Sequence, residues 1–180
     1  MKYAILLLFI FHSVFCFSQE NNLILTEKEN ELWLKKLNTI ENLSEKINLI
    51  NQRLKNDSNI YIEWSLPDGI TVERIPVLDS LRKVRIKGFC KPLYILKYKS
   101  ENLAFRFENP INDNKINSVI KLINIENIKS IELVDDETKA LFGASDNCGI
   151  ILMTTDKESI SKGFEKLNLT FYYLEEILTY

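Results

Sequence analysis

Apolar residues recur every three or four positions in the N-terminal third of the chain. The repeating positions are Trp33, Leu37, Ile40, Leu43, Ile47, Ile50 and Leu54. This spacing places them on one face of a helix, and the capping-box pair Thr26 and Glu29 marks where the helix begins. Weak helix formers between residues 38 and 42 leave two predictions open: one helix ending near Lys55, or two helices with a break between them.

The apolar face of this helical segment has two interpretations. It packs against the rest of its own domain, or it binds a partner protein or a second copy of the chain. The apolar seam is too short and too irregular to indicate a coiled coil.

Beyond a polar turn at residues 56–59, the spacing of apolar residues changes from three or four positions to two, which predicts strands. The predicted strands are Ile60–Trp64, Ile70–Ile75, Val84–Ile86, Leu93–Tyr98, Leu103–Phe107, Ser130–Val134, Ile150–Met153 and Leu169–Tyr173. The run Ile150–Met153 does not alternate with polar residues, which is typical of a strand covered on both faces.

Two further helices are predicted among these strands. Asn112 or Asp113 caps the first, in which apolar residues have helical spacing over 116–123. The second is the short segment Glu137–Phe142, and Gly143 adopts the left-handed conformation that ends it.

Residues 1–18 have the layout of a secretory signal peptide. A basic residue precedes the apolar run Ala4–Phe11, and small residues follow it. We expect cleavage after Ser18 or Gln19, so that the mature chain enters the periplasm, associates with the outer membrane, or is secreted.

Two other interpretations of this segment are weaker. Cys16 could carry a lipid anchor, but Phe15 before it is bulkier than lipoprotein processing normally requires. A retained membrane anchor needs about 20 apolar residues, and this run is shorter. We expect no transmembrane segment after signal cleavage.

Composition and charge exclude several classes of function. The formal net charge is −2 with acidic and basic residues well mixed, so no large basic face for nucleic acid is expected. The one histidine, His12, leaves with the signal peptide. A mature chain without histidine cannot carry a Ser-His-Asp or Cys-His nucleophile. We therefore expect no catalytic residues, no metal site and no cofactor.

Residues 84–157 resemble the plug domain of TonB-dependent outer-membrane receptors. Ile128–Thr155 has the family pattern of two apolar strands around a short segment that ends at a glycine. Val84–Gly88 is similar to the "IRIRG" strand of plugs, Lys91–Leu96 to "rPLYVID", and Leu122–Val134 to "LNPEDIESIEVL". The order and spacing of these segments follow the family.

The resemblance implies an α+β fold, in which helices pack on a small mixed sheet. It divides the chain into a signal peptide at residues 1–18, a helical N-terminal segment at 19–56 and a plug-like domain at 57–180. In full receptors the plug lies inside a barrel and moves when the TonB protein pulls an N-terminal segment. We expect this chain to differ in having no barrel, and Lys97-Tyr98 stands where the Asp-Gly turn is usual.

The resemblance also concerns the two cysteines that follow the signal peptide, Cys90 and Cys148. In the family, the strand next to Cys90 and the strand after Cys148 belong to one sheet. Because an envelope compartment favours oxidation, we hypothesise a Cys90–Cys148 disulfide. Two buried free thiols are the alternative. Gly143 and Gly149 are expected to have conformational roles at turns.

Three further groups of residues have a functional and a structural interpretation. Asp135, Asp136 and Glu137 lack the ligand spacing of a calcium loop, and helix capping accounts for them. The apolar segment Leu23–Thr26 is similar to a TonB-contact segment, but also suits the start of a helix. Aromatic residues on the predicted strands either line a ligand groove or belong to the core. They are Tyr94, Tyr98, Phe105, Phe107, Phe171, Tyr172 and Tyr173.

The sequence favours an exported, non-catalytic plug-like protein that binds another cell-envelope protein, with a conceivable link to TonB-dependent uptake. The contact would use the helical segment or an exposed sheet edge. The alternative is a periplasmic or secreted small-ligand-binding protein with a pocket beside the aromatic strands. An enzyme ranks third, since it would need carboxylate or Tyr/Lys chemistry. The oligomeric state is left open.

Overall fold

The computed structural model describes residues 23–62, 86–107, 113–134, 148–167 and 171–173. Its helices are α2 (Glu27–Thr39), α3 (Leu43–Asp57), α4 (Asp113–Leu122) and α6 (Glu158–Glu165). Its strands are β1 (Ile60–Tyr61), β2 (Ile86–Lys87), β3 (Leu93–Tyr98), β4 (Glu101–Phe105), β5 (Ser130–Leu133), β6 (Ile150–Thr155) and β7 (Phe171–Tyr173).

Five of the described strands form one mixed sheet in the order β5-β6-β3-β4-β7. Strands β3 and β6 are parallel, and the other neighbours in this sheet are antiparallel. The short strands β1 and β2 form a separate parallel pair. The predicted α+β class, a small mixed sheet with packed helices, is thus confirmed.

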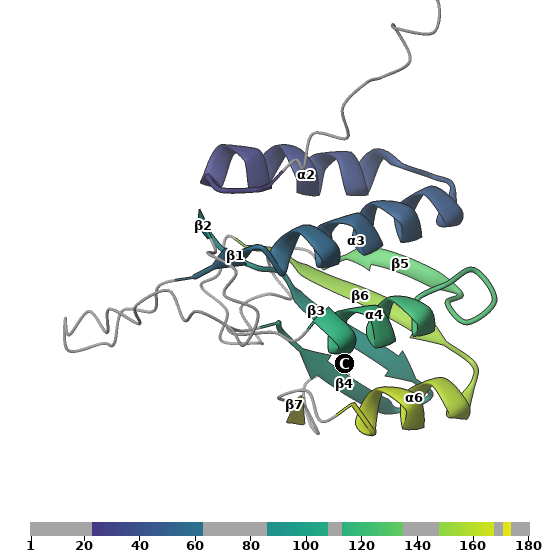
Figure 1. Ribbon diagram of the computed structural model, residues 1–180. Helices are drawn as coiled ribbons and strands as arrows, with labels where there is room; N and C mark the ends of the chain where they lie inside the picture. The colour runs from purple at the N-terminus through teal and green to yellow at the C-terminus, as the bar shows by residue number, and fades with distance from the viewer. Residues whose placement is uncertain (1–22, 63–85, 108–112, 135–147, 168–170, 174–180) are drawn as a thin grey trace, which may run out of the picture.

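One face of the large sheet carries the main core. The register places Tyr94 beside both Phe105 and Ile151, so these side chains share a face. Residues of all four described helices pack on this face (Figure 1). The helical contributors to the core are Trp33, Leu37, Ile47, Ile50, Leu54, Ile116, Val119, Ile160 and Phe164. Because successive side chains of a strand point to opposite faces, the residues between these core positions lie on a second face of the sheet.

The second face of the sheet changes character along the strands. Ile95, Ala104 and Ile150 form a smaller apolar cluster near the start of β3 and β6. At the other end the register brings Lys97 beside Thr154. Among the described residues, strand positions and Val134 make up this cluster, and no described helix contributes to it.

The N-terminal helical segment consists of two helices, which is the second of the two predictions for it. Thr26 and Glu29 form the predicted capping box at the start of α2. Asn42 caps α3, since its side chain accepts hydrogen bonds from the backbone N–H groups of Ser44 and Glu45 at 2.9 and 3.2 Å. The apolar face of both helices packs on the sheet of the same chain.

The start of the described chain also joins this core. Ile24 is buried in it, next to the capping box of α2. Leu23–Thr26 therefore contributes to the packing of the helix entrance, which is the structural interpretation of this segment.

The edge of the sheet at β5 is covered. The N–H of Val134 donates to the carbonyl of Ile150, on β6, at 2.9 Å. Because the backbone groups of successive residues in β5 face β6 and the open side in turn, those of Ile131, three positions earlier, face away from β6. The ammonium group of Lys46, on α3, donates to the Ile131 carbonyl at 3.0 Å. Helices α2 and α3 both contact β5, and in Figure 1 α2 lies at the top with α3 between it and β5 in the view. A helix and a lysine together close this edge to further strands.

Several predictions need correction or lie outside the described residues. Strand β4 begins at Glu101 rather than Leu103, because the hairpin pairs Tyr98 with Glu101 across a tight turn. Helix α6 had no counterpart among the predicted elements. The signal peptide at 1–18, the strand at 70–75, the helix at 137–142 with its caps, and Gly143 lie outside the described residues.

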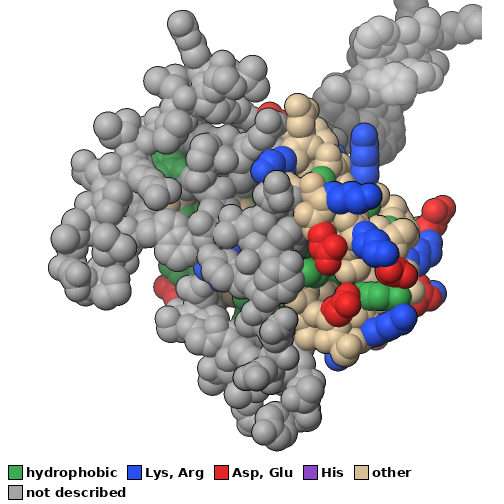
Figure 2. All heavy atoms as spheres, turned by 90° about the horizontal axis from the view of Figure 1, so that it is seen from below, with side chains coloured by type: hydrophobic (Ala, Val, Ile, Leu, Met, Phe, Trp, Pro, Cys, Tyr) green, Lys and Arg blue, Asp and Glu red, His purple; other side chains and the backbone are tan. Residues whose placement is uncertain are grey.

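Within the described ranges, no helix is both long enough and apolar enough to cross a membrane. The surface in Figure 2 shows acidic and basic side chains next to one another on the described part of that face. Ion pairs among the described residues include Lys129 with Asp156 at 3.1 Å, and Lys162 with Glu158. The described surface in this view thus carries mixed charge, as the sequence predicts.

Lys99 provides a test of the β3–β4 turn. It has a φ of 53°, in the left-handed region that disfavours most side chains. Lys99→Gly is expected to raise the free energy of unfolding by about 0.5 kcal/mol, because strain relief exceeds the added chain entropy. Urea denaturation measures the change. The matched control, Ser100→Gly, should lower stability, and an equal gain there would contradict the turn geometry.

Candidate functional site

Cys90 and Cys148 lie together where two parallel strands begin. They form a disulfide bond, with Cα atoms 5.6 Å apart. Cys90 precedes β3 and Cys148 precedes β6, and the N–H of Leu93 donates to the carbonyl of Gly149 at 3.0 Å. Both cysteines are buried. The bond therefore joins the starts of the two central strands beneath the helical layer.

Helix α2 contacts this corner through one side of its surface. The side-chain amide of Asn30 donates to the carbonyl of Cys148 at 3.4 Å, and Asn30 is fully buried. One turn later, Leu34 lies against Gly149, so closely that a Cβ atom on residue 149 would come within 2.5 Å of a Leu34 methyl carbon. Gly149 also has a φ of 87°. Both its backbone conformation and its close approach to α2 favour glycine.

Gly149→Ala is expected to lower the free energy of unfolding by about 2 kcal/mol, from backbone strain and from the clash with Leu34. Chemical denaturation measures the loss. Adding Leu34→Ala should relieve only the clash. Gly149→Ala should therefore lower the free energy of unfolding by less in the Leu34→Ala background than in the wild type. An equal loss of free energy of unfolding in the two backgrounds would show that the close approach of Leu34 to residue 149 has no effect on stability.

Helix α3 contacts the same corner through a buried arginine. The guanidinium of Arg53 donates from Nη2 to the carbonyl of Cys90 at 2.9 Å. Its Nε lies 2.8 Å from a carboxylate oxygen of Asp57, one turn along the helix. The ring of Trp33, on α2, stacks over the guanidinium with 5.1 Å between Cζ and the ring centroid. Arg53 is only 2% exposed.

Burial controls the ionisation of this cluster. Removal from water raises the pKa of Asp57 to about 6, although the positive charges of Arg53 and Lys91 act in the opposite direction. The pKa of Tyr94 is raised as well, by burial and then by the negative charge of Asp57. The Tyr94 hydroxyl is buried and has no hydrogen-bond partner among the described residues. Asp57 therefore changes its protonation state nearer to neutral pH than an ordinary aspartate does.

The geometry suits a structural task better than a chemical one. Arg53, Asp57 and Lys91 are each at most 3% exposed, which keeps their charges away from solvent. The guanidinium donates from Nη2 to a backbone carbonyl and forms a close ion pair with a neighbouring carboxylate. Such an arrangement fixes the helices relative to the strands.

The structure brings some of the predicted site residues together and separates others. Cys90, Cys148 and Gly149 share the corner around the disulfide. Tyr94, Phe105 and Phe107 form a stacked and edge-to-face cluster in the core. These three aromatic side chains are at most 3% exposed, so they do not line a groove. The side chains at 171–173 lie outside the described part of the molecule.

Sequence reasoning missed the polar members of the corner. Asn30 lies three and seven positions before Trp33 and Leu37, on the apolar face, and Arg53 is followed by Asp57 one turn later. A polar residue on an apolar helical face, or an i,i+4 pair of opposite charges beside it, could have indicated burial. The hydrogen-bond partner of such a residue could not be found from the helical pattern, because Cys148 is 118 residues from Asn30.

Across the described part of the chain, no group of three or more His, Cys, Asp or Glu side chains could hold a metal ion. Comparison of the chain with protein-family models, with curated proteins and with solved structures gave no match.

Proposed function

We propose that this chain is an exported plug-like module that acts without catalysis, by binding another protein of the bacterial cell envelope. The supporting observation is the arrangement of the segments that resemble a plug domain. Strand β5 belongs to the "LNPEDIESIEVL" segment, β6 to the segment after Gly149, and β3 to the "rPLYVID" segment. They are adjacent in the order β5-β6-β3. These three segments thus form one continuous part of the sheet, whereas the "IRIRG" segment supplies β2 of the separate pair.

The packing narrows the choice of contact surface. The apolar face of α2 and α3 is used in the core, so it is closed to a partner while both helices are docked. The β5 edge is covered by α2 and Lys46. Within the described chain, β7 pairs with β4 and has no neighbour on its other side. We assign the partner contact to this outer edge of β7, through addition of an extended segment of the partner.

Affinity recovery from cross-linked cells tests the proposal. The full chain with a C-terminal tag is expressed with its own N-terminus, cells are cross-linked, and the envelope fraction is purified and identified by mass spectrometry. We expect enrichment of one envelope protein over a tag-only control. Recovery of no envelope protein would count against the function.

A proline scan of β7 tests the surface separately. Backbone N–H groups of an edge strand alternate between the sheet and its open side. Proline is tolerated at positions that face the open side, where it blocks strand addition. Among Phe171→Pro, Tyr172→Pro and Tyr173→Pro, we expect at least one stably folded variant that no longer recovers the partner. Full recovery by every folded variant would place the contact elsewhere.

A further inference from the structure

The corner around the disulfide contains a closed series of contacts, which we call the contact ring. Its members are Cys90, Cys148, Asn30, Trp33 and Arg53. The disulfide joins Cys90 to Cys148, Asn30 donates to the Cys148 carbonyl, and the helix backbone joins Asn30 to Trp33. Trp33 stacks on Arg53, and Arg53 donates to the Cys90 carbonyl. The ring therefore depends on one covalent bond between the strands.

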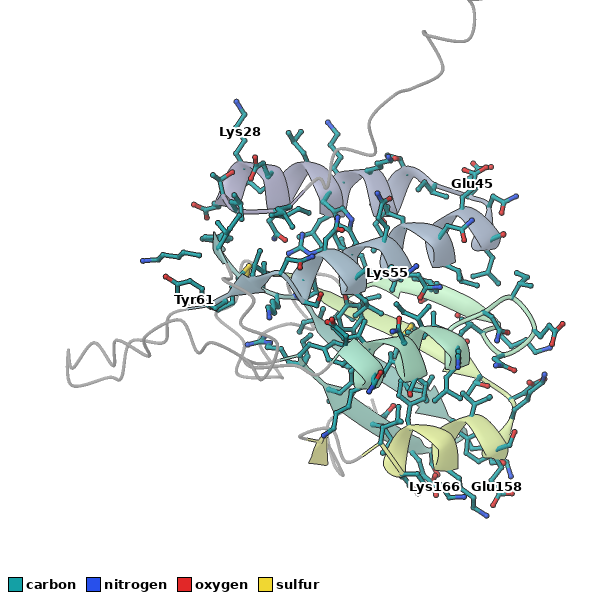
Figure 3. All side chains as sticks on the ribbon, in the orientation of Figure 1. Lys28, Glu45, Lys55, Tyr61, Glu158 and Lys166 are labelled. Atoms are coloured by element: carbon teal, nitrogen blue, oxygen red, sulfur yellow. A yellow bond between two sulfur atoms is a disulfide. The ribbon has the colours of Figure 1, made fainter. Side chains whose placement is uncertain are left out.

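Helix α2 depends on this ring more than the other described helices do. Its buried residues are Asn30, Trp33 and Leu37, and the first two are ring members. Helices α4 and α6 contribute apolar residues to the core, whereas α2 and α3 donate the side-chain hydrogen bonds to the cysteine carbonyls. The outward side of α2 is polar except for the exposed Leu32, and Lys28 points away from the molecule in Figure 3. Cleavage of the disulfide should thus weaken the docking of α2 before that of the other described helices.

We propose that the Cys90–Cys148 disulfide holds helix α2 on the sheet, and that its reduction releases α2 locally while the sheet, α4 and α6 remain folded. The reductant is a dithiol. It supplies two electrons, the S–S bond breaks, each sulfur takes up one proton, and the dithiol closes its own disulfide. The starts of β3 and β6 then lose their covalent link, and the carbonyls that receive Asn30 and Arg53 can move apart.

Release of α2 would have a consequence for recognition. It would uncover the apolar side of α2 and the part of the β5 edge that α2 covers, while Lys46 on α3 keeps its hydrogen bond to the Ile131 carbonyl. This inference is independent of the proposed β7 contact, since it concerns the opposite edge of the sheet.

Hydrogen exchange of the full chain tests the release. Oxidised protein is compared with protein refolded and kept in dithiothreitol, with far-UV circular dichroism to follow the fold. We expect amides of α2 to exchange at least about tenfold faster after reduction, with a clearly smaller change in α4, α6 and β3. An equal change in all elements, or none in α2, would overturn the proposal.

A second readout uses Trp33, which is almost completely shielded. In a Trp64→Phe variant, Trp33 is the one remaining tryptophan of the chain. Reduction should shift its emission to longer wavelength and increase quenching by acrylamide, while circular dichroism still reports a folded sheet. Continued shielding of Trp33 in the folded, reduced protein would overturn the proposal.

A third comparison tests the contact ring with the disulfide intact. Asn30→Ala interrupts the contact ring in oxidised protein and should accelerate exchange in α2 by about tenfold. The matched control is Asn51→Ala, which removes a similar hydrogen bond to the Ile123 carbonyl at 3.0 Å, outside the ring. It should leave α2 exchange unchanged. Equal effects of the two variants on α2 would overturn the proposal.

Discussion

Replacement of Cys90 and Cys148 together by serine is expected to lower the free energy of unfolding by about 4 kcal/mol. The bond closes a loop with a sequence separation of 58 residues, so its loss gives the unfolded chain a large gain in conformational freedom. Chemical denaturation without reductant measures the difference. The loss should be visible at equilibrium even where the folded structure hardly changes.

Reduction of the wild-type chain provides the control for this result. Reduced wild type and the double serine variant should have similar stability, because both lack the cross-link. Mass spectrometry after alkylation without reductant should find neither Cys90 nor Cys148 alkylated in protein isolated from its native cells. Alkylation of both would show that the two thiols are free in the cell, and the stability difference should then disappear.

Arg53→Ala is expected to lower the free energy of unfolding by about 3 to 5 kcal/mol at neutral pH. The substitution leaves the buried carboxylate of Asp57 without its nearest cation, and it removes the donor to the Cys90 carbonyl and the group under Trp33. Lys91 remains as a positive charge that acts on Asp57. Denaturation by urea at constant ionic strength measures the loss.

The protonation of Asp57 also makes the free energy of unfolding depend on pH. The pKa of Asp57 is about 6 in the folded chain, above its ordinary value of 3.8, mainly because of burial. The folded state therefore binds the proton more tightly than the unfolded state. The resulting stabilisation is complete below about pH 4 and is lost as the pH rises through about 6. For this group alone the loss is on the order of 3 kcal/mol.

Substitutions at Asp57 separate this effect from other titrations. Arg53 lowers the pKa of Asp57, so Arg53→Ala should extend the pH-dependent loss to higher pH. Asp57→Asn should flatten the dependence between pH 4 and 6. In the Asp57→Asn background, Arg53→Ala should cost less at pH 7 than it does alone. An unchanged pH profile in Asp57→Asn would contradict the assignment.

Sequence reasoning succeeded where local pattern and packing agree. The boundaries of β3 follow directly from the strand-prone run Leu93–Tyr98, and the capping box begins α2 where Thr26 and Glu29 predict it. Helix α6 was missed because its local signals are weak. Lys157 caps it without a side-chain hydrogen bond, and Gly163 lies inside an eight-residue helix.

The candidate site could be predicted only in part. Its cysteines and Gly149 were found through the resemblance and through turn chemistry. Charged residues such as Arg53 and Asp57 ordinarily face solvent, so their burial depends on which helix covers which strand. The link from Asn30 to Cys148 depends on the complete tertiary structure, because helical and strand periodicities carry no information about contacts at that range.

The hydrogen bond from Lys46 to Ile131 also bears on the order in which the chain can fold safely. The N-terminal helices provide the cover of β5, but the strands that pair with and build up this edge come much later in the chain. An intermediate with a formed sheet and undocked helices would expose unpaired backbone groups that can bind another copy. Early docking of residues from the beginning of the chain would thus shield the β5 edge from self-association.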